Sequence, residues 1–321
     1  MIEKILENLY RIEIPLPRNP LKAINSYVIK TPERNLIIDT GMNREECMKA
    51  MQDGLSELGV DLRETDFFIT HLHADHLGLV SNLATNSSTI FFNQPDADRI
   101  SGGFLWDDMI NFAGKSGFPE NELRAALHNH PGYKYSPKGH VTFHILKEDN
   151  TISIGDYVFT CVETPGHTRG HMCLYESGKK IFISGDHILH DITPNIQLWS
   201  NKENPLNEYM ASLDKVYGLD IELVLPGHRI IFRNCKKRIQ ELKKHHQHRA
   251  DEVLSLLENG GQNAYQVASR MSWDITYASW DLFPVAQKWF ATGEAIAHLK
   301  YLEEKGMVQR EMRDHTIVFS L

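Results

Sequence analysis

The run Thr70-His-Leu-His-Ala-Asp-His-Leu-Gly78 constrains this chain more than any other feature. It follows the apolar run Phe67–Ile69 and holds four potential metal ligands, which are His71, His73, Asp75 and His76. Imidazole nitrogens and carboxylate oxygens are ligands for a divalent cation such as zinc. Alternate residues of an extended chain point the same way, so the first two histidines can face one position while the other two ligands face a neighbouring one. The motif predicts two adjacent metal sites, and a polar turn at a strand end is the alternative.

Three later segments share one form, in which a short apolar run ends in a tight glycine turn that delivers one His or Asp. The turns are Pro165-Gly166-His167, Ser184-Gly185-Asp186 and Pro226-Gly227-His228. Glycine allows sharp backbone geometry, and a rigid sheet holds a ligand placed at the end of a strand. Any one of these turns could be an ordinary loop. Together with the first motif they indicate one assembled site.

In this order the motifs resemble the metallo-β-lactamase superfamily, over roughly residues 5–235. The resemblance implies that the first metal site is formed by His71, His73 and His167. It implies that the second site is formed by Asp75, His76 and His228, and that the ligand bridging both is Asp186. It also implies that Asp39 accepts a hydrogen bond that orients a ligand or the backbone of the metal loop. A turn aspartate before Gly41 is the simpler interpretation of Asp39.

Departures from related patterns narrow the choice within this superfamily. Asp186 stands where one β-lactamase subclass has Cys, and His73 stands where di-iron flavoprotein oxidoreductases carry Glu. We find no segment resembling the RNA-processing insertion of the β-CASP nucleases. Arg229 follows His228, whereas thioester hydrolases of the glyoxalase II type usually have Gly there. Arg229 thus argues against glyoxalase II itself. The pattern favours a lactamase-like branch that is related to glyoxalase II.

The order of predicted elements is typical of two βα halves. A helix is expected from residue 43, with Asn43 as N-cap, Glu46 at the capping-box position and Gly59 at its end. The scheme repeats from 141 to 228. The resemblance implies an α/β protein whose residues 1–235 form an αββα sandwich, the catalytic domain.

The segment 93–138 is too apolar for a plain surface loop, and we interpret it as a helical insertion in the catalytic domain. Its aromatic face, which includes residues 104–106, could form a cap over a substrate pocket or a dimer contact. A satellite core is the alternative. Trp106 is thus a possible substrate contact, as are His187 and His190, which follow Asp186 in a pattern found in bacterial relatives with a C-terminal winged helix.

Residues 236–321 are predicted to form a separate domain of three helices and a small hairpin, which resembles a winged helix. This part carries 12 lysines and arginines and 11 acidic residues, out of 34 and 42 in the whole chain. Phosphate binding depends on clustered positive charge, so nucleic acid is not the favoured partner. A structural or dimerising role, with a possible homodimer, fits better. The basic residues at 236–238 and 243–244 are where a local patch would lie.

Composition indicates a cytoplasmic protein without a membrane partner. No apolar run approaches the roughly 20 residues that span a bilayer, and the N-terminus lacks the pattern of a signal peptide. The four cysteines are scattered without C-x-x-C spacing, so no disulfide framework is expected.

The expected activity follows from two neighbouring divalent cations, with zinc favoured and iron or manganese as alternatives. They would lower the pKa of a shared water, and the bridging hydroxide would attack an ester, thioester or lactone of a small-molecule substrate. Asp75 is the expected relay of a proton to the leaving group. We therefore predict a metal-dependent hydrolase, an enzyme with a dinuclear zinc site.

Three alternatives remain open. A metal-dependent phosphodiesterase or endoribonuclease is weakened by the acidic main domain. A mononuclear iron sulfur dioxygenase would use the same histidines. A non-catalytic binding module is disfavoured by the intact set of seven ligands.

Overall fold

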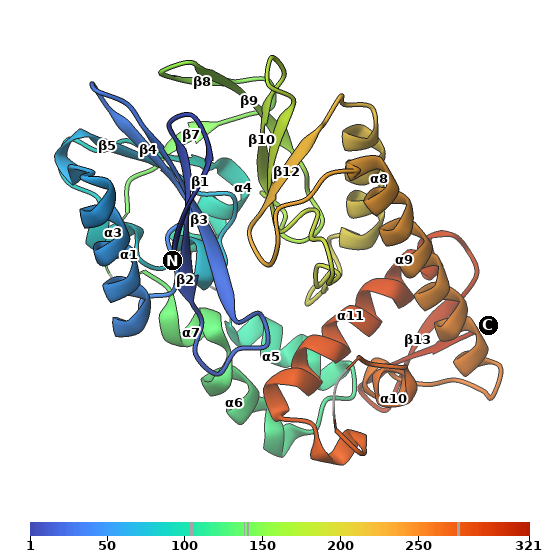
Figure 1. Cartoon of the computed structure of the whole chain (residues 1–321). Helices are drawn as coiled ribbons and strands as arrows, with labels where there is room; N and C mark the ends of the chain where they lie inside the picture. The colour runs from blue at the N-terminus through green and yellow to red at the C-terminus, as the bar shows by residue number, and fades with distance from the viewer. Residues whose placement is uncertain (103–105, 138, 140, 275–276) are drawn as a thin grey trace. The chain divides into compact units, whose positions relative to one another are not determined.

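The computed structural model describes residues 1–102, 106–137, 139, 141–274 and 277–321 (Figure 1). The chain forms two compact units, each assembled from separated segments. Unit 1 contains Met1–Gly103, Tyr135–Pro194 and Lys215–Arg238, and unit 2 contains Phe104–Lys134, Asn195–Asp214 and Ile239–Leu321. The sequence-based domains 1–235 and 236–321 stay a prediction.

A seven-stranded sheet in unit 1 sets one half of the site. Its strands, in spatial and chain order, are β1 (Ile2–Leu6), β2 (Leu9–Pro15), β3 (Ala23–Lys30), β4 (Asn35–Ile38), β5 (Thr65–Phe68), β6 (Ile90–Asn93) and β7 (His144–Leu146). The first four strands pair antiparallel, whereas β4 to β7 pair parallel. The carboxyl ends of β4, β5 and β6 therefore meet at one edge, where polar side chains can gather.

A five-stranded sheet of unit 1 supplies the other ligands. Its order is β12 (Leu223–Pro226), β11 (Ile181–Gly185), β10 (Met172–Glu176), β9 (Tyr157–Glu163) and β8 (Thr151–Ile154). Only β11 and β12 pair parallel, so Asp186 and His228 leave the sheet at the same edge. His167 lies in the connection between the antiparallel strands β9 and β10.

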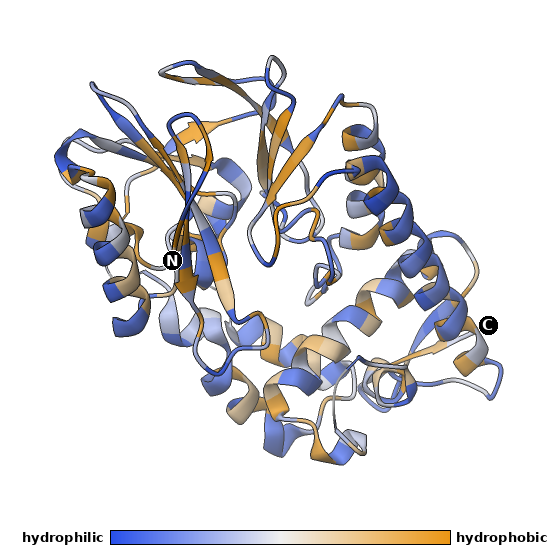
Figure 2. Cartoon of the chain, viewed as in Figure 1, coloured by the Kyte–Doolittle hydropathy of each residue, from blue (hydrophilic) through white to orange (hydrophobic). Residues whose placement is uncertain are grey.

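The two sheets share one hydrophobic core. Buried side chains of the first sheet, including Tyr27, Ile38 and Phe68, belong to the same cluster as Phe159 and Leu174 of the second. Figure 2 shows the apolar character of these strands. The predicted α/β architecture, with two packed sheets, outer helices and a small C-terminal part, is confirmed.

The helices of unit 1 include α1 (Glu45–Leu58), the short α2 (Ala74–Leu77) and α3 (Val80–Leu83), and α4 (Gln94–Ser101). The end of α1 is as predicted, since Gly59 caps it at φ 63°. The predicted Asn43 N-cap is wrong. Arg44 occupies that position without a side-chain cap, and its guanidinium lies 2.8 Å from the Glu46 carboxylate. The predicted capping box required the Glu46 side chain, and this ion pair holds that side chain instead.

The predicted insertion contains α4, α5 (Trp106–Lys115), α6 (Glu120–Asn129) and α7 (Pro131–Tyr135). Helices α5 and α6 belong to unit 2, where they pack against each other. Phe104 and Leu105 of the expected aromatic face lie outside the described residues. The cap therefore stays a prediction.

The described residues of the C-terminal segment form three α-helices and a two-stranded antiparallel hairpin. These are α9 (Cys235–Leu257), α10 (Ala264–Arg270), α11 (Val285–Glu304), β13 (Gln309–Arg313) and β14 (Thr316–Ser320), preceded in the chain by α8 (Pro205–Tyr217). A capping box between Asn263 and Gln266 starts α10. In the part of the chain that the structure describes, no helix combines the length and apolar character needed to cross a membrane.

Unit 2 buries a cluster of ionisable side chains. His246 and His298 lie 3.3 Å apart between Nδ1 and Nε2, and Arg249 Nε lies 3.5 Å from Glu294 Oε1. Burial lowers the pKa of His298 to about 4 and raises the pKa of Glu294 to about 7, against the lowering effect of Arg249. Because a proton on Glu294 is favoured by folding, this carboxyl should link stability to pH.

We expect the free energy of unfolding of the wild type, relative to a Glu294→Gln variant, to fall by roughly 1–3 kcal/mol as pH rises from about 5 to about 8. The native state binds more protons than the unfolded state between the ordinary pKa of 4.5 and the native value of about 7. The contribution is therefore complete at low pH and lost as pH rises through the native value. Urea denaturation of both proteins at several pH values measures the difference between their free energies of unfolding. His298 is present in both proteins, so its titration cancels in this difference. A constant difference would contradict the prediction.

Candidate metal centre

The first motif changes direction directly after β5. His71 lies in a bend that follows the strand, and His73, with extended backbone, occupies the N-cap position of α2. Asp75 and His76 sit in the first turn of this helix, and the amides of His76 and Leu77 donate to the His73 carbonyl. The change from strand to helix between Phe68 and Ala74 turns the second pair of ligands away from the first.

All seven sequence-predicted ligands meet in unit 1. They form three overlapping groups whose potential ligand atoms lie within 4.8 Å of one another, namely His71, His73 and His167; His71, His76 and Asp186; and Asp75, His76 and His228. Asp186 is central, with one carboxylate oxygen 3.5 Å from His76 Nε2 and the other 3.6 Å from His167 Nε2. His228 Nε2 lies 3.4 Å from Asp75 Oδ2 and 3.5 Å from Asp186 Oδ2. Their role as ligands stays a prediction.

The donor set fits divalent cations. His76 Nε2, His228 Nε2 and Asp186 Oδ1 are fully buried and have no hydrogen-bond partner among the described residues. Leaving such atoms unsatisfied is costly, and they rarely converge on one point without a reason. Three imidazoles on one side, and two imidazoles with carboxylates on the other, suit two adjacent cations.

Electrostatics differ between the two halves of the centre. Burial, reinforced by the neighbouring imidazoles, lowers the pKa of His71 well below its ordinary value. Burial also acts to lower the pKa of His76 and His228, but nearby carboxylates reverse it. Asp39 and Asp186 raise the pKa of His76, and Asp186 and Asp75 raise that of His228 to about 10. The acidic half therefore attracts positive charge, which a cation would supply.

Asp39 lies directly behind the second half of the centre. Its Oδ2 is 2.7 Å from His76 Nδ1, and its Oδ1 accepts from the Thr70 amide at 2.9 Å. The residue has φ 58°, unusual for a non-glycine, and is 2% exposed. When His76 donates from Nδ1, its Nε2 lone pair is left for a cation, as the expected orienting role requires.

Two buried residues at the centre were not recognised in the sequence. His171 accepts from the Asp186 amide at Nε2, 3.1 Å away, and its Nδ1 is 2.8 Å from the Thr164 hydroxyl. Asp96, in the first turn of α4, accepts hydrogen bonds from Leu72 and Thr168, next to predicted ligands. His171 follows His167 in one loop, which was a usable signal, whereas Asp96 resembles any acidic residue at a helix start.

The glycines of the motifs serve two different purposes. Gly185 has φ 47°, the left-handed geometry expected of a sharp turn. Gly227 lies in a bend but does not have a positive φ, so left-handed geometry is not what requires glycine there. A Cβ at Gly227 would lie 2.6 Å from Asp186 Oδ1 and 2.8 Å from His76 Cε1. Only glycine lets the β12 turn approach these ligands so closely.

The possible substrate contacts take different positions. His187 is buried, with its ring 6.2 Å from that of His171, whereas His190 is exposed and packs on Phe232. Trp106 belongs to unit 2 and its ring contacts His130 and Tyr133. Contact of these three residues with substrate stays a prediction.

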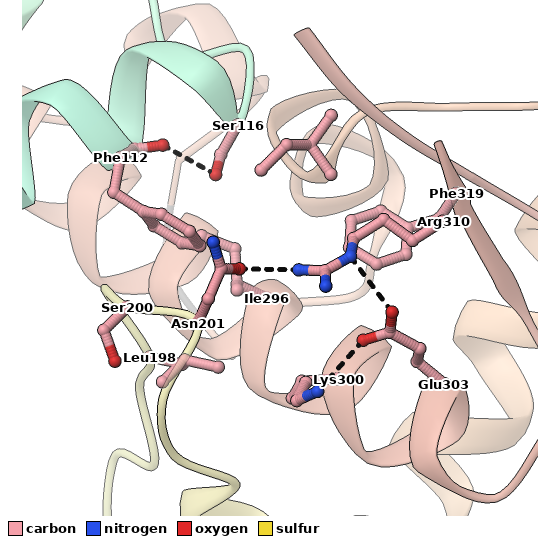
Figure 3. A pocket seen from close by; sticks show the side chains of 11 residues that line it. Phe112, Ser116, Leu198, Ser200, Asn201, Ile296, Lys300, Glu303, Arg310 and Phe319 are labelled. Carbon is pink, nitrogen blue, oxygen red and sulfur yellow. Dashed lines mark hydrogen bonds and ion pairs between the residues drawn. The ribbon is translucent and has the colours of Figure 1, made fainter. Parts of the chain in front are cut away.

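Two cavities differ greatly in size. An open groove of about 550 Å³ in unit 1 is lined by Pro15, Leu21, Ala23 and Arg229, among others. It adjoins the centre, because His228 Nδ1 donates to the Ala23 carbonyl at 2.7 Å. The cavity in unit 2, beside the ion pair of Arg310 and Glu303, has about 10 Å³, room for one water (Figure 3).

Comparison with known families agrees with this geometry. The model of the metallo-beta-lactamase superfamily matches residues 20–228. The model of the metallo-beta-lactamase-like C-terminal domain matches residues 278–321. The first match spans more than half of the chain, which therefore belongs to the metallo-beta-lactamase superfamily.

Individual relatives extend the similarity to nearly the whole chain. A probable metallo-hydrolase, YqjP, of Bacillus subtilis is 24% identical over 326 residues, with 98% of both chains covered. An atrochrysone carboxyl ACP thioesterase of Aspergillus fumigatus is 27% identical, over 74% of this chain and 61% of its own. The crystal structure of a metallo-beta-lactamase family protein from Thermus thermophilus matches with a TM-score of 0.83 at 24% identity, with 99% of both chains covered.

A Gly227→Ala variant is expected to bind divalent cations at least about 10-fold more weakly than the wild type, because the added methyl group displaces Asp186 and His76. Metal content after dialysis against a defined free-zinc concentration measures the loss. Gly114→Ala is the matched control, since a Cβ there meets only a side-chain carbon at an ordinary 3.7 Å. Equal metal content in both variants would show that the close approach is unimportant.

Proposed function

We propose that this protein is a metal-dependent hydrolase that acts on a thioester, ester or lactone bond of a small molecule. The observation that carries the proposal is the convergence of seven His and Asp side chains, with the Asp186 carboxylate among them in contact with three of the imidazoles. The similarity to a probable metallo-hydrolase and to a carboxyl ACP thioesterase supports hydrolysis, and a thioester in particular.

The centre would take two divalent cations, zinc in the first instance and iron or manganese under other supply, and they would supply Lewis acidity toward the substrate carbonyl and toward a water. The first would be held by His71, His73 and His167 and the second by Asp75, His76 and His228, with Asp186 shared.

Asp75 is the residue that we propose to move the proton. Burial acts to raise its pKa, but the imidazole of His228, 3.4 Å away, and that of His76 hold the pKa well below its ordinary value. The group is therefore a carboxylate near neutral pH and can accept a proton from the attacking water. It can then deliver this proton to the leaving oxygen or sulfur, which makes it a relay and not a standing acid.

The C-terminal segment belongs to the proposal as well. Three helices, the β13–β14 hairpin and the match to a C-terminal domain model support a winged-helix-like appendage. We propose a structural or dimerising role for it, and a cytoplasmic enzyme of the branch related to glyoxalase II.

A small-molecule substrate is favoured over nucleic acid because basic side chains in residues 236–244 already make contacts within the protein. Lys243 lies 2.5 Å from Asp214 Oδ1, Lys236 stacks over the Tyr217 ring, and Arg238 donates to the carbonyls of Leu189 and Ile192. These cations are engaged within the protein. A phosphate backbone would have to compete with those contacts.

The test is a substrate panel of thioesters, lactones, phosphodiesters and labelled RNA, assayed with zinc, iron or manganese. We expect thioester hydrolysis that a chelator abolishes and a divalent metal restores. His73→Ala should lower kcat/KM at least about 100-fold, whereas the exposed His248→Ala, on α9, should leave it unchanged. RNA cleavage lost in the His73 variant would instead select the endoribonuclease. Oxygen uptake with a persulfide would select the dioxygenase.

A further inference from the structure

Asp96 is a buried carboxylate that joins two of the ligand-bearing segments. It is 0% exposed and lies in α4, directly after β6. Its Oδ2 accepts from the Leu72 amide at 3.0 Å and from the Thr168 hydroxyl at 2.8 Å. Its Oδ1 accepts from the Gly170 amide at 2.9 Å. Both carboxylate oxygens are thus used by residues far away in the chain.

The topology of the first sheet explains why this carboxylate reaches the site. Strands β5 and β6 are parallel neighbours, so the motif after β5 and the start of α4 after β6 lie at the same edge. The β9–β10 connection approaches α4 so closely that a Cβ at Gly170 would lie 1.7 Å from Asn93 Oδ1. Little room is left for the loop to take another position.

We propose that Asp96 is a positioning residue for the first metal site. One carboxylate holds the Leu72 amide, between His71 and His73, and it holds the Thr168 hydroxyl and the Gly170 amide in the loop that bears His167. This inference rests on the metal centre of the proposed function, but not on which substrate is hydrolysed.

A local helix-capping role does not account for these contacts. Asn93 already caps α4 by accepting from the Asp96 amide at 2.8 Å. An acidic side chain that only complements a helix start can remain in water. Burying a carboxylate is costly unless hydrogen bonds compensate it, and here three donors from two ligand-bearing segments do so.

The arrangement also predicts selectivity between the two metal sites. Asp39 contacts His76 and Thr70, on the opposite side of the motif, whereas the three hydrogen bonds that Asp96 accepts come from segments that bear His71, His73 and His167. Loss of Asp96 should therefore weaken the first metal site and spare the second, in which Asp75, His76 and His228 have other supports.

The experiment measures zinc affinity of the metal-free full-length protein by competition with a chromophoric chelator, without any substrate. Asp96→Asn keeps the shape but replaces one acceptor oxygen by an NH₂ group. We expect one of two zinc ions to bind roughly 10–100-fold more weakly and the other to bind as in the wild type. Asp98→Asn is the matched control, because Asp98 is an exposed aspartate of the same helix. It should bind both ions normally.

Double mutants show which of the two metal sites binds its zinc ion more weakly. In a His228→Ala background, which disables the second site, Asp96→Asn should still weaken zinc binding roughly 10–100-fold. In a His73→Ala background, which disables the first, it should weaken binding less than about threefold. Equal losses in both backgrounds would overturn the assignment to the first site.

Two controls separate a loss of zinc affinity from a loss of folding. They are a milder variant and the melting temperature of the metal-free proteins. Thr168→Val removes one of the three hydrogen bonds with little change of shape and should weaken the same ion by a smaller factor. A lowered melting temperature with unchanged zinc affinity in both variants would reduce Asp96 to a fold-stabilising residue and overturn the proposal. A wild type that binds no zinc would instead refute the metal centre, and normal zinc binding without hydrolysis would refute only the activity.

Discussion

Burial of ionisable side chains at one edge of unit 1 is the constraint on which the remaining structure depends. Five imidazoles and two carboxylates are largely withdrawn from water within a few ångströms of each other. Imidazole–carboxylate pairs compensate part of this cost, with Asp186 and Asp75 facing His228. Cations between the groups would compensate the rest, which is why the fold is best understood as a frame for binding metal.

The frame holds the ligands through the backbone more than through the ligand side chains themselves. Parallel pairing brings the ends of β4, β5 and β6 to one edge, and β11 with β12 does the same in the second sheet. Asp39 and Asp96 then fasten the first motif from two sides, and His171 fastens the Asp186 amide. A core shared by both sheets keeps these edges from moving independently, so the packing of apolar residues supports the precision of the site.

The sequence predicted which seven side chains come together, because each sits in a local pattern, a strand followed by a turn with a His or Asp. It could not predict Asp96, whose hydrogen-bond partners lie 24, 72 and 74 residues away and whose neighbours in sequence look like an ordinary helix start. The Asn43 cap failed for a local reason, the competing ion pair of Arg44 with Glu46. For Gly227 the sequence indicated only a turn, whereas the close approach that requires glycine depends on residues that only the fold brings near.

The most direct test of the central claim is anomalous diffraction from crystals of the full chain grown with zinc. We expect two anomalous peaks in unit 1, one among His71, His73 and His167 and the other among Asp75, His76 and His228, with Asp186 between them. No peak among these side chains, or strong peaks only elsewhere on the protein, would contradict the account.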